Sequence, residues 1–231
     1  HHGLMIAGEA ALSNWDAGMD MYIYGKLGNL IMTKEGINVL MTNLTGKVPP
    51  ILQRLDYIRF NGEAAGYLHD LTLTGLFYTG AGMVKTDVMM SIDEQSMSRT
   101  YSGSVASADL DLGKLLNQEK KFGKVDFNVE LKGFNYKNRY PESYIKGIIS
   151  SFEYSQYQYE NIMLDGVYKD GGFNGRLSMD DANGSVQIDG NFNVAKTIPD
   201  FNLKASVKNL RPHDLHLSDK YENASISLGL T

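Results

Sequence analysis

The sequence predicts a mainly β protein built as a curved, largely antiparallel sheet, with one or two short helices. Three observations lead there. Several segments alternate strictly between apolar and polar residues, which is the period of a β-strand. Glycine is frequent, at 24 of 231 residues, while proline occurs only 5 times. A pattern recurs in which two apolar residues and then a glycine occupy every second position of a segment. These features are typical of a sheet with many turns and bends.

Composition excludes several classes of protein. The formal net charge is −5 and the chain has no basic block, so we expect no nucleic-acid partner. There is no cysteine, which excludes disulfides and thiolate zinc sites. No apolar run approaches the roughly 18 residues that a membrane-spanning helix needs. A chain of this length is large enough to bury a substantial core.

Alternation is clearest in five segments, namely residues 84–92, 125–131, 186–194, 201–207 and 224–230. In the second of them, Val, Phe, Val and Leu alternate with Asp, Asn and Glu. Successive side chains of a strand point to opposite faces, so each segment places its apolar groups on one face and its hydrated groups on the other. This arrangement indicates an antiparallel sheet that is wet on one side.

The recurring glycines lie where the next inward side chain should be. The candidate bend glycines are Gly75, Gly133, Gly166 and Gly190. A missing Cβ lets a strand bend or lets another backbone approach closely, and repetition over many strands favours a sheet that curls. The spacing between the copies is irregular, so this is a loose repeat of one strand type and not a solenoid of fixed period.

Turns and short helices separate these strands. Residues 170–172 and 180–184 predict two hairpins, because Asp, Asn and Gly cluster there between apolar runs. Residues 49–55 predict one or two helical turns opened by proline, and residues 111–119 predict another short helix with leucines on one side. Both segments would cover an end of the sheet as short plugs. No break in composition marks a domain boundary.

Candidate reactive or metal-binding groups are few. His213 and His216 are three residues apart, which suits a metal on a helical turn, but they lead into an apparent strand and no third ligand is evident. Residues 180–184 lack the spacing and the terminal glutamate of a calcium loop, and turn chemistry explains them. There is no nucleophile motif and no phosphate-binding loop. We therefore expect no enzyme activity, no metal and no cofactor.

An aromatic run contains Phe152, Tyr154, Tyr157 and Tyr159. Ordinary cross-strand packing is the favoured interpretation. The same residues could stack on a sugar, so an alternative is a secreted β-sandwich that binds a glycan or a protein through this Tyr-rich strip. A sandwich has the same alternating strands as an open sheet, with its apolar faces closed on each other.

Five stretches resemble, in amino-acid sequence and in order, the core signature of TamB-like and AsmA-like proteins in the form found in Bacteroidota. They are YSGSV (101–105), DLDLGKLL (109–116), FGKVDFNVELKG (122–133), YENIMLDG (159–166) and GFNGRLSMDD (172–181). The similarity covers residues 50–231, whereas residues 1–50 match only in general style. These motifs are moderately specific, since a simple β-strand pattern can imitate any one of them but not the order in which they follow one another.

The resemblance implies that residues 1–231 form a single β-groove region cut from a longer protein. Such proteins are periplasmic bridges, anchored in the inner membrane and reaching toward the outer membrane. Their sheet folds over into an apolar groove. The implied function is non-enzymatic: the groove carries phospholipid acyl chains or assists outer-membrane protein assembly. The expected partners are lipid acyl chains, and the outer-membrane assembly machinery through parts absent from this chain.

If the groove exists, the apolar members of the alternating segments should line it. The candidate lining residues are Val125, Phe127, Val129, Leu131, Ile162, Leu164, Val186, Ile188, Phe192, Phe201, Leu203 and Ala205. Each methylene moved from water into such a groove gains about 0.8 kcal/mol, which is enough to hold a lipid chain.

Overall fold

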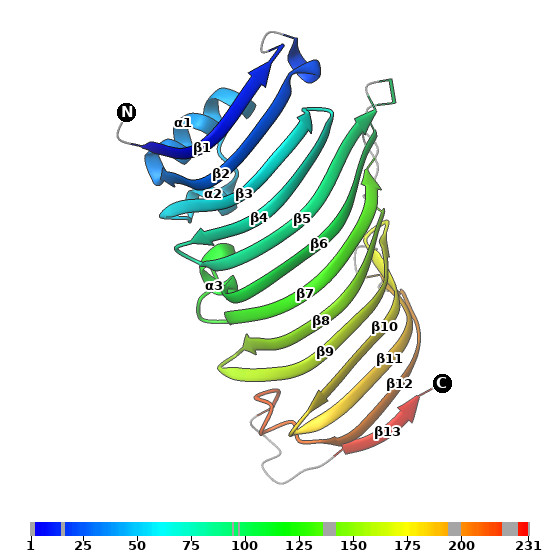
Figure 1. Cartoon of the computed structure of the whole chain (residues 1–231). Helices are drawn as coiled ribbons and strands as arrows, with labels where there is room; N and C mark the ends of the chain where they lie inside the picture. Colours follow the sequence, from blue (N-terminus) through cyan, green and yellow to red (C-terminus); the bar gives the residue numbers. More distant parts are fainter. Residues whose placement is uncertain are drawn as a thin grey trace.

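A computed structural model describes residues 3–14, 17–93, 95–96, 98–135, 142–193, 200–218 and 226–230, without the side chains of residues 43–45, 192, 200–201 and 228–230. The described chain forms one antiparallel sheet of 13 strands, in which every strand pairs with its neighbours in sequence (Figure 1). The strands are β1 (Leu4–Ser13), β2 (Tyr22–Thr33), β3 (Tyr57–Tyr67), β4 (Asp70–Thr79), β5 (Gly82–Asp93), β6 (Ser98–Asp111), β7 (Phe122–Asn135), β8 (Glu142–Tyr154), β9 (Tyr157–Lys169), β10 (Gly172–Asp181), β11 (Gly184–Asn193), β12 (Asp200–Leu210) and β13 (Ile226–Leu230).

This architecture confirms the predicted fold class. The sheet is curved and unclosed, since β1 and β13 lie at opposite ends of the strand order. Within the described ranges no second sheet packs on it, so the sandwich alternative is wrong as a description of the fold. Of the five alternating segments, residue 194 and residues 224–225 lie outside the described residues; the rest fall in β5, β7, β11, β12 and β13.

The two predicted hairpins are confirmed. Strands β9 and β10 are joined through Asp170 and Gly171, whose φ values of 51° and 76° are those of a two-residue turn matched to the twist of the sheet. Strands β10 and β11 are joined between Asp181 and Gly184. The Asp181 carboxylate accepts the Asn183 backbone N–H at 2.9 Å, which is the turn chemistry expected of this segment.

Both predicted helical plugs exist, as α2 (Pro50–Gln53) and α3 (Leu112–Leu116). A 3₁₀ turn, η1 (Gly18–Asp20), precedes β2, and a longer helix, α1 (Lys34–Thr45), follows it. Sequence reasoning missed α1. It begins at Thr33, whose hydroxyl accepts the Gly36 N–H, and it ends at Gly46 in the left-handed conformation with φ 74°.

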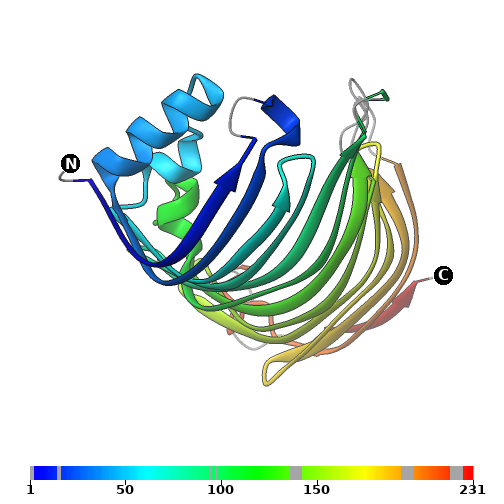
Figure 2. The ribbon, with the colours of Figure 1, turned by 45° about the horizontal axis from the view of Figure 1, so that its top comes forward.

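The sheet curves into a trough, and α1, α2 and α3 lie over its concave side along one edge (Figure 2). We call this edge the closed rim. It is the edge where β2, β6 and β12 end, and where α1, α2, α3 and the turn at residues 211–218 follow them. The opposite edge, at hairpins such as those joining β3 to β4 and β9 to β10, is the open rim.

The hydrophobic core lies at the closed rim, between the helices and the strand ends. Its buried members come from helices and strands alike: Ile37, Leu55, Ile58, Ala81, Leu110, Leu115 and Val125. A single-layer sheet has no partner to bury either of its faces, so the helices supply the second layer that a core needs.

Candidate functional site: an apolar trough

The strand registers place all of the predicted lining residues whose side chains are described on the same face of the sheet. On β7, Val125, Phe127, Val129 and Leu131 occupy that face. Phe127 lies opposite Ile149 of β8, which in turn lies opposite Ile162 of β9. The same row continues through Met179, Val186 and Val207 to Leu228 of β13.

A second row on this face joins Leu164 to Leu177, Ile188 and Ala205. Phe192 and Phe201 hold matching register positions at the open rim, but their side chains lie outside the described residues. Leu203 lies opposite Gly190.

This apolar face is the concave one, because the helices and the core pack against it. Val125 is 6 % exposed, since α3 covers it. Farther from the closed rim, Val129, Leu131, Ile162 and Leu164 are only half-buried. Each of these side chains contacts neighbouring strands of the sheet and leaves part of its surface exposed on the concave face. The sequence alone could not tell which face curves inward.

The bend glycines lie on this face as well. Gly166, Gly175 and Gly190 are direct neighbours across three strands. A Cβ at Gly166 would lie 2.5 Å from Cζ of Phe173 and 2.6 Å from the Asn174 carbonyl oxygen, so a larger residue cannot be accommodated without a shift. The absence of a Cβ at Gly166 therefore leaves room for the Phe173 ring of the neighbouring strand close to the backbone.

The same arrangement recurs at two other bend glycines. The Phe60 ring covers the pair Gly62 and Gly75, where a Cβ at Gly75 would lie 2.6 Å from Cε2 of Phe60. The Tyr101 ring covers Gly133, where a Cβ would lie 2.6 Å from the Tyr101 hydroxyl oxygen. Three of the four predicted bend glycines, Gly75, Gly133 and Gly166, thus lie against an aromatic ring, whereas Gly190 lies against Leu203.

The formal charges of the strands are concentrated on the convex face of the sheet. The convex face carries cross-strand ion pairs, such as Arg176 with Asp189 at 3.0 Å and Lys146 with Asp165 at 3.5 Å. Among the described strand side chains of the concave face, only Arg99 and Asp181 carry a formal charge, as the registers of all 13 strands show. The trough wall is therefore close to neutral along its whole length.

At the C-terminal half of the closed rim, a turn takes the place of a helix. Leu215 is fully buried at 0 % exposure, and its carbonyl oxygen accepts a hydrogen bond of 2.7 Å from the Tyr159 hydroxyl. The ring of His216 lies 5.8 Å from that of Tyr157, and its Nδ1 lies 2.9 Å from the Ser155 carbonyl oxygen. Sequence reasoning expected this segment to lead into a strand. Residues 212–216 form a turn, and residues 219–225, which follow before β13, lie outside the described part of the chain.

The aromatic run packs as the favoured interpretation predicted. Phe152 lies opposite Tyr159, and Tyr154 opposite Tyr157, in the hairpin that joins β8 to β9. The Tyr157 and Tyr159 rings meet edge to face at 4.7 Å. Tyr159 is 8 % exposed, so it offers no open ring face for a sugar to stack on.

Tyr157 is held by polar groups at the closed rim. Its hydroxyl donates to an Asp181 carboxylate oxygen at 2.5 Å and accepts from the Asn183 side-chain amide at 3.1 Å. Burial, followed by the hydrogen bond to Asp181, raises the pKa of Tyr157 to about 12. Burial also raises the pKa of Tyr159. Both phenols stay protonated at neutral pH and act as structural donors.

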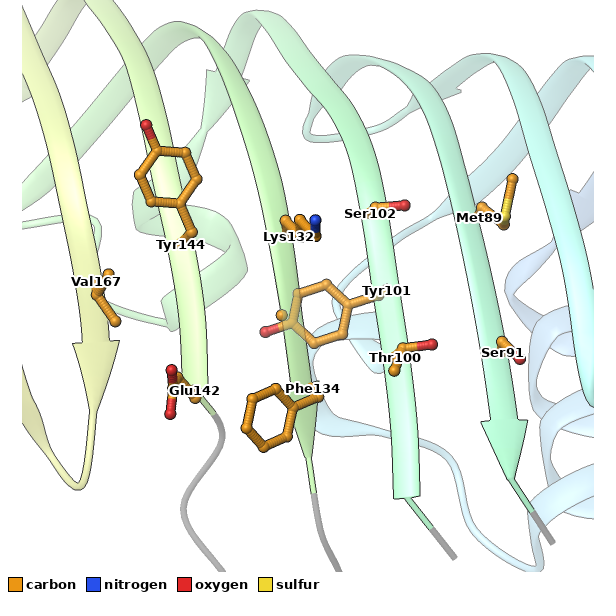
Figure 3. A pocket seen from close by; sticks show the side chains of 11 residues that line it. Met89, Ser91, Thr100, Tyr101, Ser102, Lys132, Phe134, Glu142, Tyr144 and Val167 are labelled. Carbon is orange, nitrogen blue, oxygen red and sulfur yellow. The ribbon is translucent and has the colours of Figure 1, made fainter.

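The convex face has depressions that the sequence did not indicate. One of about 440 Å³ crosses β5 to β9, and Met89, Lys132, Phe134, Tyr144 and Val167 contribute to its lining (Figure 3). Met89 is 51 % exposed. The alternation places Met89, Phe134, Tyr144 and Val167 on a face that is otherwise mostly polar, and this is the sequence signal that could have found the depression.

No group of three or more His, Asp or Glu side chains within the described residues could hold a metal ion. His213 pairs weakly with Asp214 at 3.6 Å, while His216 bonds elsewhere. In the part of the chain that the structure describes, no helix has the length and apolar character to cross a membrane.

Comparison of the chain with models of known protein families, with curated proteins and with solved structures found no match.

Proposed function

We propose that this chain is a non-enzymatic, lipid-handling segment whose concave trough holds acyl chains. One observation carries the proposal: the concave face presents an apolar row that runs from Phe127 of β7 to Val207 of β12, with no second sheet over it in the described residues. A wall without a deep pocket or a charged trap would hold a chain by burial of its methylenes and still let it slide along the trough.

The sequence resemblance supports a cellular setting for this activity. In this proposal the chain is part of a TamB-like or AsmA-like bridge between the inner and outer membranes and lies in the periplasm. It contributes to phospholipid transport or to outer-membrane protein assembly, with the assembly machinery bound by parts outside this chain. The curved open sheet is compatible with that role, and so is the division of charge between its two faces.

A pair of adjacent residues on β9 gives a matched test. Leu164 faces the trough and is half-buried, whereas Met163 faces outward and is 54 % exposed. We expect a fluorescent fatty acid, cis-parinaric acid, to bind the wild-type chain. Leu164→Gln should weaken that binding about tenfold, since a polar amide in the apolar wall costs about 1–3 kcal/mol. Met163→Gln should leave binding unchanged.

Unfolding in urea, followed by circular dichroism, checks that both variants fold. If Leu164→Gln does not, Val129→Thr replaces it, because threonine has nearly the shape of valine and adds only a hydroxyl. Absence of fatty-acid binding by the wild-type chain would sink the proposal, and so would an equal loss in the trough and control variants.

A further inference from the structure

Arg99 is the one described strand cation on the concave face, and it lies at the open rim. It is the second residue of β6, next to the hairpin that joins β5 to β6. The other charged residue of this face, Asp181, lies at the closed rim and is bonded to Tyr157. Among the described strand residues, Arg99 is thus the one positive charge on an otherwise nearly neutral concave face, and it lies at the open rim.

The surroundings of Arg99 are half polar and half apolar. Directly opposite it lie Ile92 of β5 and Asn135 of β7. Two residues along β6, the Tyr101 hydroxyl is hydrogen-bonded to the Ser143 hydroxyl. Arg99 is exposed, and none of the ion pairs among the described residues involves it. Its guanidinium is therefore available to an outside anion.

Arginine is well suited to such an anion. Its planar guanidinium can donate two parallel hydrogen bonds to a phosphate or a carboxylate, and these charge-assisted bonds are about twice as strong as neutral ones. The Asn135 amide, which neighbours it across the strands, can add a further donor.

The dimensions of the trough suit an amphiphile anchored at this point. From Arg99 to Ser107, β6 advances by eight steps along the strand, or roughly 26 Å at about 3.3 Å per residue. One leaflet of bilayer hydrocarbon is about 15 Å thick, half of the roughly 30 Å core. A chain whose head lies at Arg99 can therefore run down the trough past Gly103 and Val105 without meeting the closed rim.

We propose that Arg99 binds the anionic head group, a phosphate or a carboxylate, of an amphiphile whose acyl chain lies in the trough. This inference rests on the proposed function and adds to it both a head-group class and an orientation. The head sits at the open rim and the tail points toward the closed rim, so loading takes place across the open rim.

Three probes test this inference on the purified chain by titration calorimetry. They are dodecyl phosphate below its micelle concentration, dodecyl maltoside as a neutral amphiphile of the same chain length, and inorganic phosphate. We expect dodecyl phosphate to bind more tightly than the maltoside, and inorganic phosphate to bind far more weakly than either. Arg99→Gln should weaken dodecyl phosphate binding about tenfold and leave the maltoside unchanged.

Two further variants identify the cause. Lys85→Gln removes one positive charge from the convex face of β5 and should change nothing, which controls for net charge. Arg99→Lys keeps the charge and should recover part of the affinity. Circular dichroism checks that the variants fold. We expect them to fold, because Arg99 is exposed and its replacement leaves no cavity.

The outcomes separate the two proposals. Equal binding of both amphiphiles, with no effect of Arg99→Gln, would overturn the head-group inference and leave the lipid trough standing. No binding of either amphiphile would overturn both. Inorganic phosphate binding as tightly as dodecyl phosphate would show that Arg99 recognises a free anion and not a lipid head group.

Discussion

The two rims of the trough differ sharply in burial. At the closed rim, α1, α2, α3 and the turn at residues 211–218 bury apolar side chains such as Ile37, Leu115 and Leu215, at 2 %, 8 % and 0 % exposure. At the open rim, Met90 and Tyr168 of the concave face remain 38 % and 37 % exposed. Within the described residues, one edge of the curved sheet is therefore covered, and apolar side chains near the other edge remain partly exposed.

This difference teaches how a single sheet can be stable and still keep apolar surface uncovered. Burial of apolar area is the main favourable term in folding. The chain concentrates that burial along one edge, where short connecting segments fold back over the strand ends. The rest of the concave face is then free of the requirement to be covered, and we infer that a ligand uses it.

The largest expected effect comes from comparing isoleucines at the two rims. Ile37→Ala should lower the free energy of unfolding by about 3 kcal/mol, because it leaves a cavity in the closed-rim core. Ile92→Ala, on the half-buried concave face near Arg99, should cost about 1 kcal/mol, since solvent already reaches this side chain. Urea unfolding measures both values, and equal losses would break the comparison.

An intermediate effect is expected at the start of α3. The Asp111 carboxylate accepts the Lys114 backbone N–H at 2.8 Å and so caps the helix. Asp111→Ala should cost about 1 kcal/mol, while Asp111→Asn keeps an acceptor and should cost less. The same urea experiment applies. If α3 contributes to the closed rim as described, the alanine variant should also make the Leu112–Leu116 amides exchange faster with solvent.

The smallest effect concerns pH at the C-terminal part of the closed rim. The pKa of Tyr157 is raised to about 12, so the folded chain keeps this proton where the unfolded chain, with an ordinary pKa near 10, has lost it. Its contribution to stability is complete below about pH 10 and declines as the pH rises toward 12.

Tyr157→Phe should remove this part of the alkaline decline, and the difference in tyrosinate absorbance between the two chains should titrate near pH 12. A difference spectrum that titrates near pH 10 would mean that the ring is less buried than the hairpin places it. The comparison has a built-in reference, because the variant leaves the other tyrosines of the chain in place.

Much of the trough could be predicted from sequence because strands have a period of two. Once Val129 and Leu131 are assigned to one face, cross-strand register carries the assignment to Leu164, Leu177 and Ile188. The glycine pattern likewise predicted a curling sheet. The short helices at residues 49–55 and 111–119 were visible through proline and leucine spacing.

Other features needed the fold. Helix α1 was missed although Ile37, Leu40 and Met41 follow helical spacing, because a short apolar run next to strands is ambiguous by itself. Arg99 was overlooked, since one cation in an alternating strand has no meaning until its face is known. The convex depression around Tyr144 was missed for the same reason.

By itself, the sequence determined that the chain forms an antiparallel sheet with one apolar face, because the alternation of apolar and polar residues is a local property of each strand. Only the tertiary structure decided that this face is concave, that helices cover one rim, and that Arg99 lies on this face at the other rim. Those properties depend on the twist and curvature accumulated over 13 strands, which no short segment contains.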